Sequence, residues 1–218
     1  MGTAHADDAD SPSVALLHLD FYFLAGDSSA AAAEEAVRSL HPRASVVASG
    51  PEWGAVLRRV WGTALQARTR VAFRPGAWDR PRLRGFIEAL PQGFVLRRIT
   101  AADADRFAEL ADSLVYNYPS SEEFAARGIG FGIEHGGRFV SGCSSFALSS
   151  RTLEFEIQTH PDFRRRGLAS AAAAAMIEHC LDERLEPCWD AHNDASAALA
   201  TKLGFVDPAP YTAYELRP

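Results

Sequence analysis

The stretch from Phe163 to Ser170 (FRRRGLAS) constrains the fold of this chain most, because it joins two segments of opposite pattern. Before it, Leu153 to Thr159 (LEFEIQT) alternates polar and apolar residues with period two, which predicts a β-strand that ends before Pro161. After it, LASAAAAAMIEHCLDE consists largely of strong helix formers. Gly167 is therefore expected at a turn from strand to helix.

A turn of this kind is a natural anion site. The first amides of a helix have no partner inside the helix, and the helix dipole adds positive potential at the same end. Gly167 and Ala169 have little bulk, so a pyrophosphate could approach the backbone, and three neighbouring arginines add positive charge. An ordinary loop with a solvated basic cluster is the alternative. The flanking strand and helix favour the phosphate site.

Composition excludes several classes of protein. Of the 218 residues, 47% are hydrophobic and 10% aromatic, which is too much for a disordered chain. The net charge of −6, without a basic face, argues against a nucleic-acid partner. No apolar run approaches the ~20 residues of a membrane span. Cys143, Cys180 and Cys188 have no metal-ligand spacing, so we expect buried thiols of a cytoplasmic protein, and no metal site or disulfide.

Three regions are expected along the chain. Residues 1–12 are small and acidic and carry no signal-peptide pattern, which predicts a disordered tail. Residues 13–92 alternate strand and helix patterns without any catalytic motif, which predicts a smaller N-terminal α/β domain. Pro91-Gln92-Gly93 then breaks the chain. Residues 93–218 follow the order β-α-α-β-β-β-α-β-α-β-β.

Two motifs in the last region resemble those of the GNAT acetyltransferase superfamily. The loop Arg164 to Ala169 matches the signature Gln/Arg-x-x-Gly-x-Gly/Ala, and Asn193 leads into a helix that ends in Lys202-Leu203-Gly204-Phe205. The resemblance covers about residues 94–218 and implies a mixed, mostly antiparallel, splayed central sheet flanked by helices.

A closer likeness extends over most of the chain. The segments FYFLAG, GIGF, THPDFRRRGLA and CWDAHNDAS together resemble a GNAT branch that includes a zwittermicin A resistance acetyltransferase. In that branch an α/β region precedes the catalytic fold.

The resemblance implies that the chain uses acetyl-CoA as a co-substrate. In GNAT proteins the pyrophosphate lies on the amides of the signature loop, and the pantetheine arm pairs with a free edge of the preceding strand. Splaying of that strand from its neighbour opens the acyl slot, and the Asn contacts the cofactor from the neighbouring strand end. The cofactor-binding residues implied in this way are Ile157, Gln158, Thr159, Arg164, Arg165, Arg166, Gly167, Leu168, Ala169, Ser170, Asn193 and Ser196.

The chain departs from the family at one position. Many GNAT enzymes have a tyrosine seven residues after the Asn, which protonates the leaving thiolate, but Ala200 stands here. Another group or water must then supply the proton, or the chemistry is lost. Ser196, Tyr211 and Tyr214 are the substitutes that the sequence offers, and it does not rank them.

The candidate catalytic residues are three carboxylates. Glu154 and Glu156 alternate with Phe155 and Ile157, so both lie on one face of the strand, where a carboxylate can take a proton from an amine. Glu156 is favoured because it is nearer the expected thioester. Salt bridges to the surrounding arginines are the alternative role for the pair. Asp190 can orient the substrate amine or cap the following helix.

The leading interpretation is an acetyl-CoA-dependent N-acetyltransferase that modifies a primary amine by direct attack on the thioester. The acidic surface suits a small cationic metabolite or antibiotic. The alternatives are a protein N-acetyltransferase and a non-catalytic acyl-CoA-binding module, for which Ala200 is the main argument. The short linker predicts that the N-terminal domain packs on the catalytic half and helps to wall the acceptor pocket, with homodimer formation as its other possible role.

Overall fold

A computed structural model describes residues 2–217. The chain forms two compact units, one from residues 2–70 with 210–217 and the other from Val71–Ala209. It passes between them in β5 (Leu65–Arg74) and β11 (Val206–Leu216), each of which gives residues to both units.

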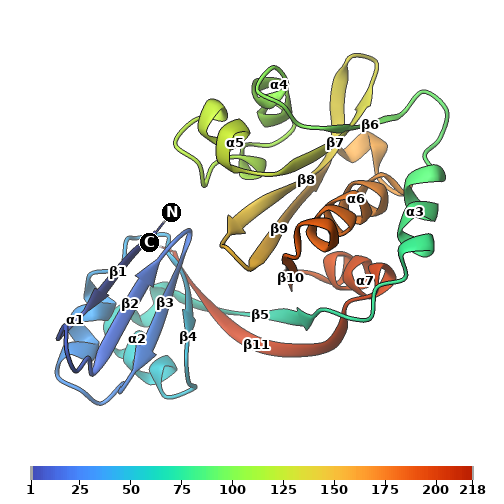
Figure 1. The fold of residues 1–218 in the computed structure, drawn as a ribbon. Coiled ribbons are helices and arrows are strands. Elements are labelled where there is room, and N and C mark those ends of the chain that lie inside the picture. Colours follow the sequence, from blue (N-terminus) through green and yellow to red (C-terminus); the bar gives the residue numbers. More distant parts are fainter. Residues whose placement is uncertain (1, 218) are drawn as a thin grey trace. The chain divides into compact units, whose positions relative to one another are not determined.

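The boundary between these units differs from the expected one, which lay between residues 92 and 93. The second unit begins at Val71 and includes α3 (Arg80–Glu88), which packs beside α6 (Leu168–Glu183) (Figure 1). The chain end belongs to the first unit because Ala213, Tyr214 and Glu215 pair with β4 (Ser45–Ala48). Both contacts are distant in sequence, so local patterns gave no sign of them.

The first unit is a small sheet with two helices. Its strands lie in the order β1 (Thr3–Ala6), β2 (Val14–His18), β3 (Phe21–Gly26), β4 and the end of β11. Only β3 and β4 pair in parallel. β1 lies within residues 1–12, where a disordered tail was expected. Its four residues are exposed and have no apolar pattern, but their backbone pairs with β2.

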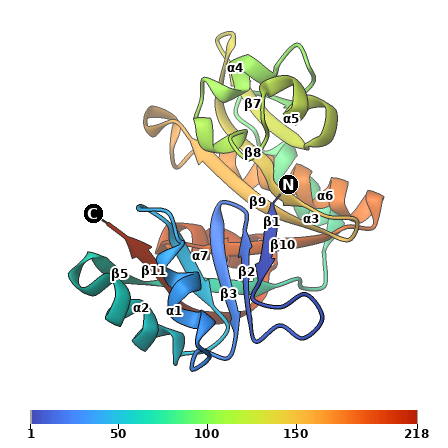
Figure 2. The ribbon, with the colours of Figure 1, turned by 90° about the vertical axis from the view of Figure 1, so that its left-hand side faces the viewer.

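The helices of the first unit pack their tryptophans against its core. Helices α1 (Ala32–Arg38) and α2 (Trp53–Trp61), followed by the 3₁₀ turn η1 (Gly62–Ala64), lie beside β2, β3 and β4 (Figure 2). The indole of Trp53 is fully buried and donates to the carbonyl of Gly26 at 3.3 Å, and the indole of Trp61 donates to Val37 at 3.1 Å. Trp53 is a core residue, and Trp61 is partly buried against the same core.

The second unit contains the longer strands. Its order is the end of β5, then β10 (Glu186–Ala191), β9 (Thr152–Thr159), β8 (Arg138–Leu148), β7 (Gly130–His135) and β6 (Val95–Arg98). Only β9 and β10 pair in parallel. This agrees with the expected mixed, mostly antiparallel sheet flanked by helices.

Helices cover both faces of this sheet (Figure 1). On one face lie α3, α6 and α7 (Asp194–Leu203), and Cys143 of β8 packs there with the buried alanines of α6. On the other lie α4 (Ala104–Ala108), η2 (Asp112–Leu114) and α5 (Ser121–Arg127). Gly142 of β8 faces them so closely that a Cβ would lie 2.4 Å from the ring of Phe107. Within residues 2–217, no helix has both the length and the apolar character that crossing a membrane requires.

Candidate active site

β9 has one open edge next to β10. The two strands pair in parallel only from Thr152 to Glu154. Beyond that point Trp189, Asp190 and Ala191 of β10 pair with β5 instead, while β9 stays paired with β8 as far as Thr159. Among the described residues, the β10-side edge of β9 from residue 155 to 159 therefore has no strand partner. Its backbone groups can accept an extended ligand as an added strand.

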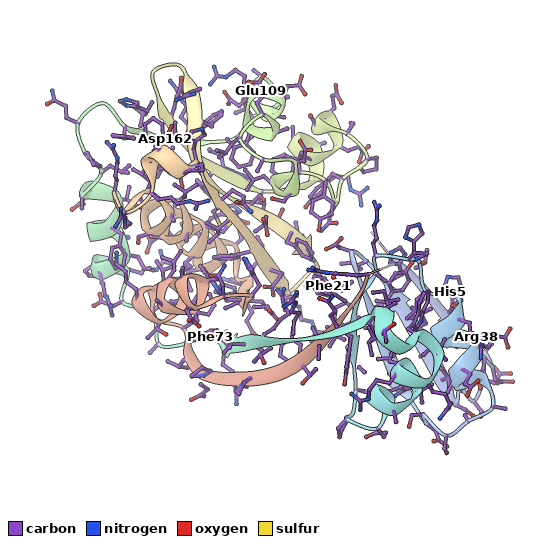
Figure 3. The ribbon with its side chains drawn as sticks, turned by 180° about the vertical axis from the view of Figure 1, so that it is seen from behind. His5, Phe21, Arg38, Phe73, Glu109 and Asp162 are labelled. Atoms are coloured by element: carbon purple, nitrogen blue, oxygen red, sulfur yellow. The ribbon has the colours of Figure 1, made fainter. Side chains whose placement is uncertain are left out.

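The strand leads directly into an anion-binding geometry. After β9 come the 3₁₀ turn η3 (Pro161–Phe163), in which Figure 3 labels Asp162, and the loop to α6. Gly167 is the N-cap of α6 with φ +80°, a conformation that favours glycine. A Cβ at Gly167 would meet nothing within 4 Å, so the space above the backbone is open. Among the residues that the structure describes, no side chain caps this helix, and its first turn has no acidic residue. Its first amides can therefore bind an anion.

Local contacts hold the arginines at this turn. Arg164 donates to the carbonyl of Thr159 at 3.3 Å, and Arg166 donates to that of Asp162 at 3.4 Å. The Arg166 guanidinium also lies 5.5 Å from the centre of the Phe163 ring. The basic cluster thus bonds partly to the turn itself, and its charge stays beside the N-terminus of α6.

One cation at this turn was missed by sequence reasoning. Lys202, near the end of α7, donates from Nζ to the Ser170 hydroxyl at 3.0 Å. In the sequence, Lys202 was noted only as part of the Lys-Leu-Gly-Phe motif. The signal available was its rarity, because Lys202 is the only lysine of the sequence. Its position beside the first turn of α6 depends on how α7 packs.

β9 has one apolar and one polar face, as predicted. Leu153 and Phe155 point into the core, and Glu154, Glu156 and Gln158 occupy the opposite face. The Gln158 amide donates to Oε1 of Glu156 at 2.8 Å.

β10 extends the polar face. The register of Cys188 against Glu154 places Cys188 and Asp190 on the same face as the two glutamates. Burial, aided by the charges of Glu154 and Glu186, raises the pKa of Cys188 to about 11. The thiol is therefore protonated at neutral pH, and the face presents carboxylates in place of a thiolate nucleophile.

Asn193 and Ser196 make contacts inside the protein. Asn193 caps α7, since its Oδ1 accepts from the amide of Ser196 at 2.8 Å, and its Nδ2 lies 2.8 Å from Nε2 of His192. Ser196 Oγ accepts from the indole of Trp189 at 3.1 Å. The cap of this helix is thus Asn193, and the capping role considered for Asp190 is wrong.

Ala200 and the candidate tyrosines differ in their surroundings. Ala200 is fully buried in the core below α6 and α7, so no hydroxyl fits there without repacking. Tyr214 belongs to the core of the first unit, where its hydroxyl lies against Gly54 of α2. Among the three proposed proton donors, Ser196 is the one that belongs to the same unit as β9.

A bulge in β8 borders the polar face. Ser145 pairs with Phe155 and Ala147 pairs with Glu154, so Phe146 is the extra residue. The segment after η2 is fixed to this bulge, because Asn117 donates to the carbonyl of Phe146 at 2.9 Å. Bulges re-aim side chains near functional sites. The sequence showed no sign of this feature.

Comparisons with known proteins agree on the family. A family model described as GNAT acetyltransferase matches residues 1–214. The chain is 32% identical to the uncharacterized N-acetyltransferase YdfB of Bacillus subtilis, over 98% of this chain and 85% of that protein. A crystal structure of a GCN5-related N-acetyltransferase-like protein from Streptococcus suis superposes with a TM-score of 0.88 and 34% identity, over 100% of this chain and 89% of that one.

A more distant structure shares the fold. A GCN5-related N-acetyltransferase from Kribbella flavida has a TM-score of 0.65 at 14% identity, over 94% of this chain and 87% of that chain. With the family model and the two closer relatives, the assignment is clear. The chain belongs to the GNAT acetyltransferase family and is an acyltransferase.

Proposed function

We propose that this GNAT acetyltransferase moves the acetyl group of acetyl-CoA to a primary amine of a small cationic molecule, with a carboxylate as general base. The observation that carries the proposal is that the open edge of β9, the uncapped start of α6 and a row of carboxylates adjoin one another in one unit.

Acetyl-CoA suits the backbone part of this site. The first-turn amides of α6, with Arg164, Arg165 and Arg166 beside them, can hold a pyrophosphate. The open edge from residue 155 to 159 offers main-chain donors and acceptors to the amide groups of the pantetheine arm. The open space over Gly167 is what such a ligand needs.

Glu156 is the best placed base. An alkylammonium group has a pKa of about 10, so the acceptor arrives protonated at neutral pH and cannot attack. Glu154 stands where β10 still pairs with β9, whereas Glu156 stands where that edge is open. The ammonium gives one proton to Glu156 and through it to solvent. Asp190, on the same face of β10, orients the cationic group.

The transfer itself is a direct attack. The neutral amine nitrogen bonds to the thioester carbonyl carbon, the carbon–sulfur bond breaks, and CoA leaves as a thiolate. The second proton lost by the nitrogen balances the one gained by the thiolate. Because Ala200 offers no hydroxyl, Ser196 or water delivers that proton.

The acceptor is proposed to be a small cation for two reasons. The polar face of β9 and β10 carries the carboxylates Glu154, Glu156 and Asp190, which favour positive charge. In addition, the likeness to a GNAT branch with a zwittermicin A resistance enzyme suggests an amine-bearing antibiotic. A protein N-terminus is the alternative acceptor.

A panel assay separates these functions. The full chain is mixed with acetyl-CoA and, in turn, with spermidine, 1,4-diaminobutane, an aminoglycoside and a peptide with a free N-terminus. Free thiol and the mass of the acetylated product are measured. We expect product from a small cationic amine. Product from the peptide alone would establish a protein acetyltransferase. Acetyl-CoA binding by calorimetry without product from any amine of the panel would contradict the proposed small cationic acceptor.

A further inference from the structure

One buried hydroxyl beside the proposed base has no partner. Ser144 on β8 is fully buried, and its Oγ forms no hydrogen bond with any residue that the structure describes. The antiparallel register places Ser144 directly opposite Glu156 on β9. Residues paired in this way point to the same face, with Cβ atoms about 5 Å apart. An unsatisfied buried hydroxyl costs free energy and needs an explanation.

The neighbouring serines of β8 are satisfied. Ser141 Oγ lies 2.8 Å from the hydroxyl of Thr159. Ser145 Oγ accepts from the amide of Ile129 at 2.9 Å and lies 2.8 Å from the hydroxyl of Tyr118. The one unsatisfied serine of the three is the one that faces Glu156.

Packing explains the size of Ser144 but leaves its hydroxyl unexplained. The same face of β7 and β8 carries Gly130, Gly132 and Gly142, where a Cβ would lie within 3 Å of aromatic rings or of Ile99. A small residue is therefore required in this row. Alanine or glycine would satisfy that requirement without burying an unpaired donor.

Glu156 can accept a second hydrogen bond. Gln158 holds Oε1, and a carboxylate has two oxygens with about four lone-pair sites. The second oxygen of Glu156 needs a donor, which a neighbouring ionised carboxylate cannot be. The Ser144 hydroxyl can donate, and it lies on β8 directly opposite Glu156. The other titratable groups on this face of β9 and β10 are Glu154, Asp190 and Cys188. Asp112 and Tyr118 lie on the segment next to it, and Cys143 lies on the opposite face of β8.

We propose that Ser144 is a positioning residue for Glu156. Rotation of the Glu156 side chain brings its second oxygen to the Ser144 hydroxyl, so that Gln158 and Ser144 hold the carboxylate from both sides while it faces the acceptor amine. This assignment rests on the proposed function, in which Glu156 accepts the proton of the amine.

The proposal fixes the direction of a pKa change. A hydrogen bond donated to an ionised carboxylate favours the charged form and lowers the pKa. Loss of the Ser144 hydroxyl therefore raises the pKa of Glu156. The carboxyl stays protonated to higher pH, and the acid limb of the pH–rate profile moves to higher pH. A role in packing alone would leave that limb in place.

The first test needs no substrate. The side-chain carboxyl carbon of Glu156 is titrated by NMR in the wild type and in Ser144→Ala, with the resonance assigned by Glu156→Gln. We expect the titration of Glu156 to move to higher pH in Ser144→Ala, because the carboxylate loses a hydrogen-bond donor. Because this hydrogen bond also stabilises the folded protein while Glu156 is ionised, Ser144→Ala should lose thermal stability at neutral pH and little at acidic pH, where the carboxyl is protonated. An unchanged Glu156 titration overturns the proposal whatever the enzyme acetylates.

The second test uses the best amine of the panel in a double-mutant cycle. Ser144→Ala should lower kcat/KM at neutral pH by about tenfold, the usual range for a hydrogen bond to a charged group. In a Glu156→Gln background the same change should have almost no effect, because the two residues act as a unit. Ser145→Ala is the matched control. It should lose thermal stability, since it breaks two hydrogen bonds, and keep the wild-type pH profile.

The outcomes separate the two proposals. If Glu156→Gln is slow but Ser144→Ala keeps the wild-type rate and acid limb, the base stands and the role of Ser144 is wrong. If Glu156→Gln is fully active, the proposed base fails, and the positioning role fails with it. Equal effects of Ser144→Ala with and without the Glu156 carboxylate would also overturn the role, because Ser144 would then act independently.

Discussion

The turn that begins α6 and the polar face of β9 adjoin each other but are built from different parts of the chain. The turn uses backbone amides and the left-handed conformation of Gly167, within one continuous stretch of sequence. The polar face uses side chains from β8, β9 and β10, which meet only through strand register. A site made of contiguous backbone can be recognised in a sequence, whereas one assembled by register needs the structure.

The largest effect should come from the side-chain site. Glu156→Gln keeps the shape of the side chain and removes its ability to take a proton, so we expect the neutral-pH rate to fall by ~10²-fold or more. Acetyl-CoA affinity, measured by calorimetry, should change little because the backbone site is untouched. Glu154→Gln is the matched comparison on the same face. A larger loss in Glu154→Gln than in Glu156→Gln would transfer the base role to Glu154.

The next effect should come from the backbone site. Gly167→Glu forces a side chain into the left-handed region and places a negative charge where phosphate is proposed to bind. We expect acetyl-CoA affinity to fall by roughly tenfold to a hundredfold, through charge repulsion and a blocked approach to the amides.

Gly136→Glu is the control for that change. Gly136 also has positive φ, at +59°, and a Cβ there would also meet nothing within 4 Å, but it lies in the turn between β7 and β8. Both variants should lose a similar ~1 kcal/mol of stability from the left-handed backbone. Equal acetyl-CoA affinity in the two variants would show that the start of α6 is not the cofactor site.

The contrast also shows what could be predicted from the sequence. The period-two pattern placed Glu154 and Glu156 on one face of β9, and helix formers after Gly167 placed the start of α6 within a residue. The domain boundary was not predictable, because the pairing of Tyr214 with β4 and the packing of α3 on α6 join segments far apart in sequence. The unsatisfied hydroxyl of Ser144 depends on register and a nearby bulge, which no local pattern encodes.

Lys202 gives a smaller and more specific test of the backbone site. As the only lysine of the sequence, it is the one side chain that an amine-selective reagent labels. Its Nζ donates to Ser170 in the first turn of α6, so bound acetyl-CoA should slow labelling of Lys202 when followed by mass spectrometry. Lys202→Met should weaken acetyl-CoA binding by about twofold to fivefold at low salt, and by less at high salt because exposed charges are screened. Labelling that acetyl-CoA leaves unchanged would separate Lys202 from the cofactor site.

The smallest effect on the rate is expected for Ser196, the side chain proposed to protonate the leaving thiolate. Ser196 lies in the first turn of α7, with its Oγ accepting from the indole of Trp189 and its amide donating to Asn193. A CoA thiolate is a tolerable leaving group and water can protonate it, so Ser196→Ala should lower kcat by no more than about threefold. The lost hydrogen bond should cost about 1 kcal/mol in urea unfolding.

Ser196→Thr, which keeps the hydroxyl, is the control. If Ser196→Ala lowers kcat by ~10²-fold and Ser196→Thr restores it, Ser196 is the acid that replaces the missing tyrosine, and the protonation step belongs to a side chain of α7.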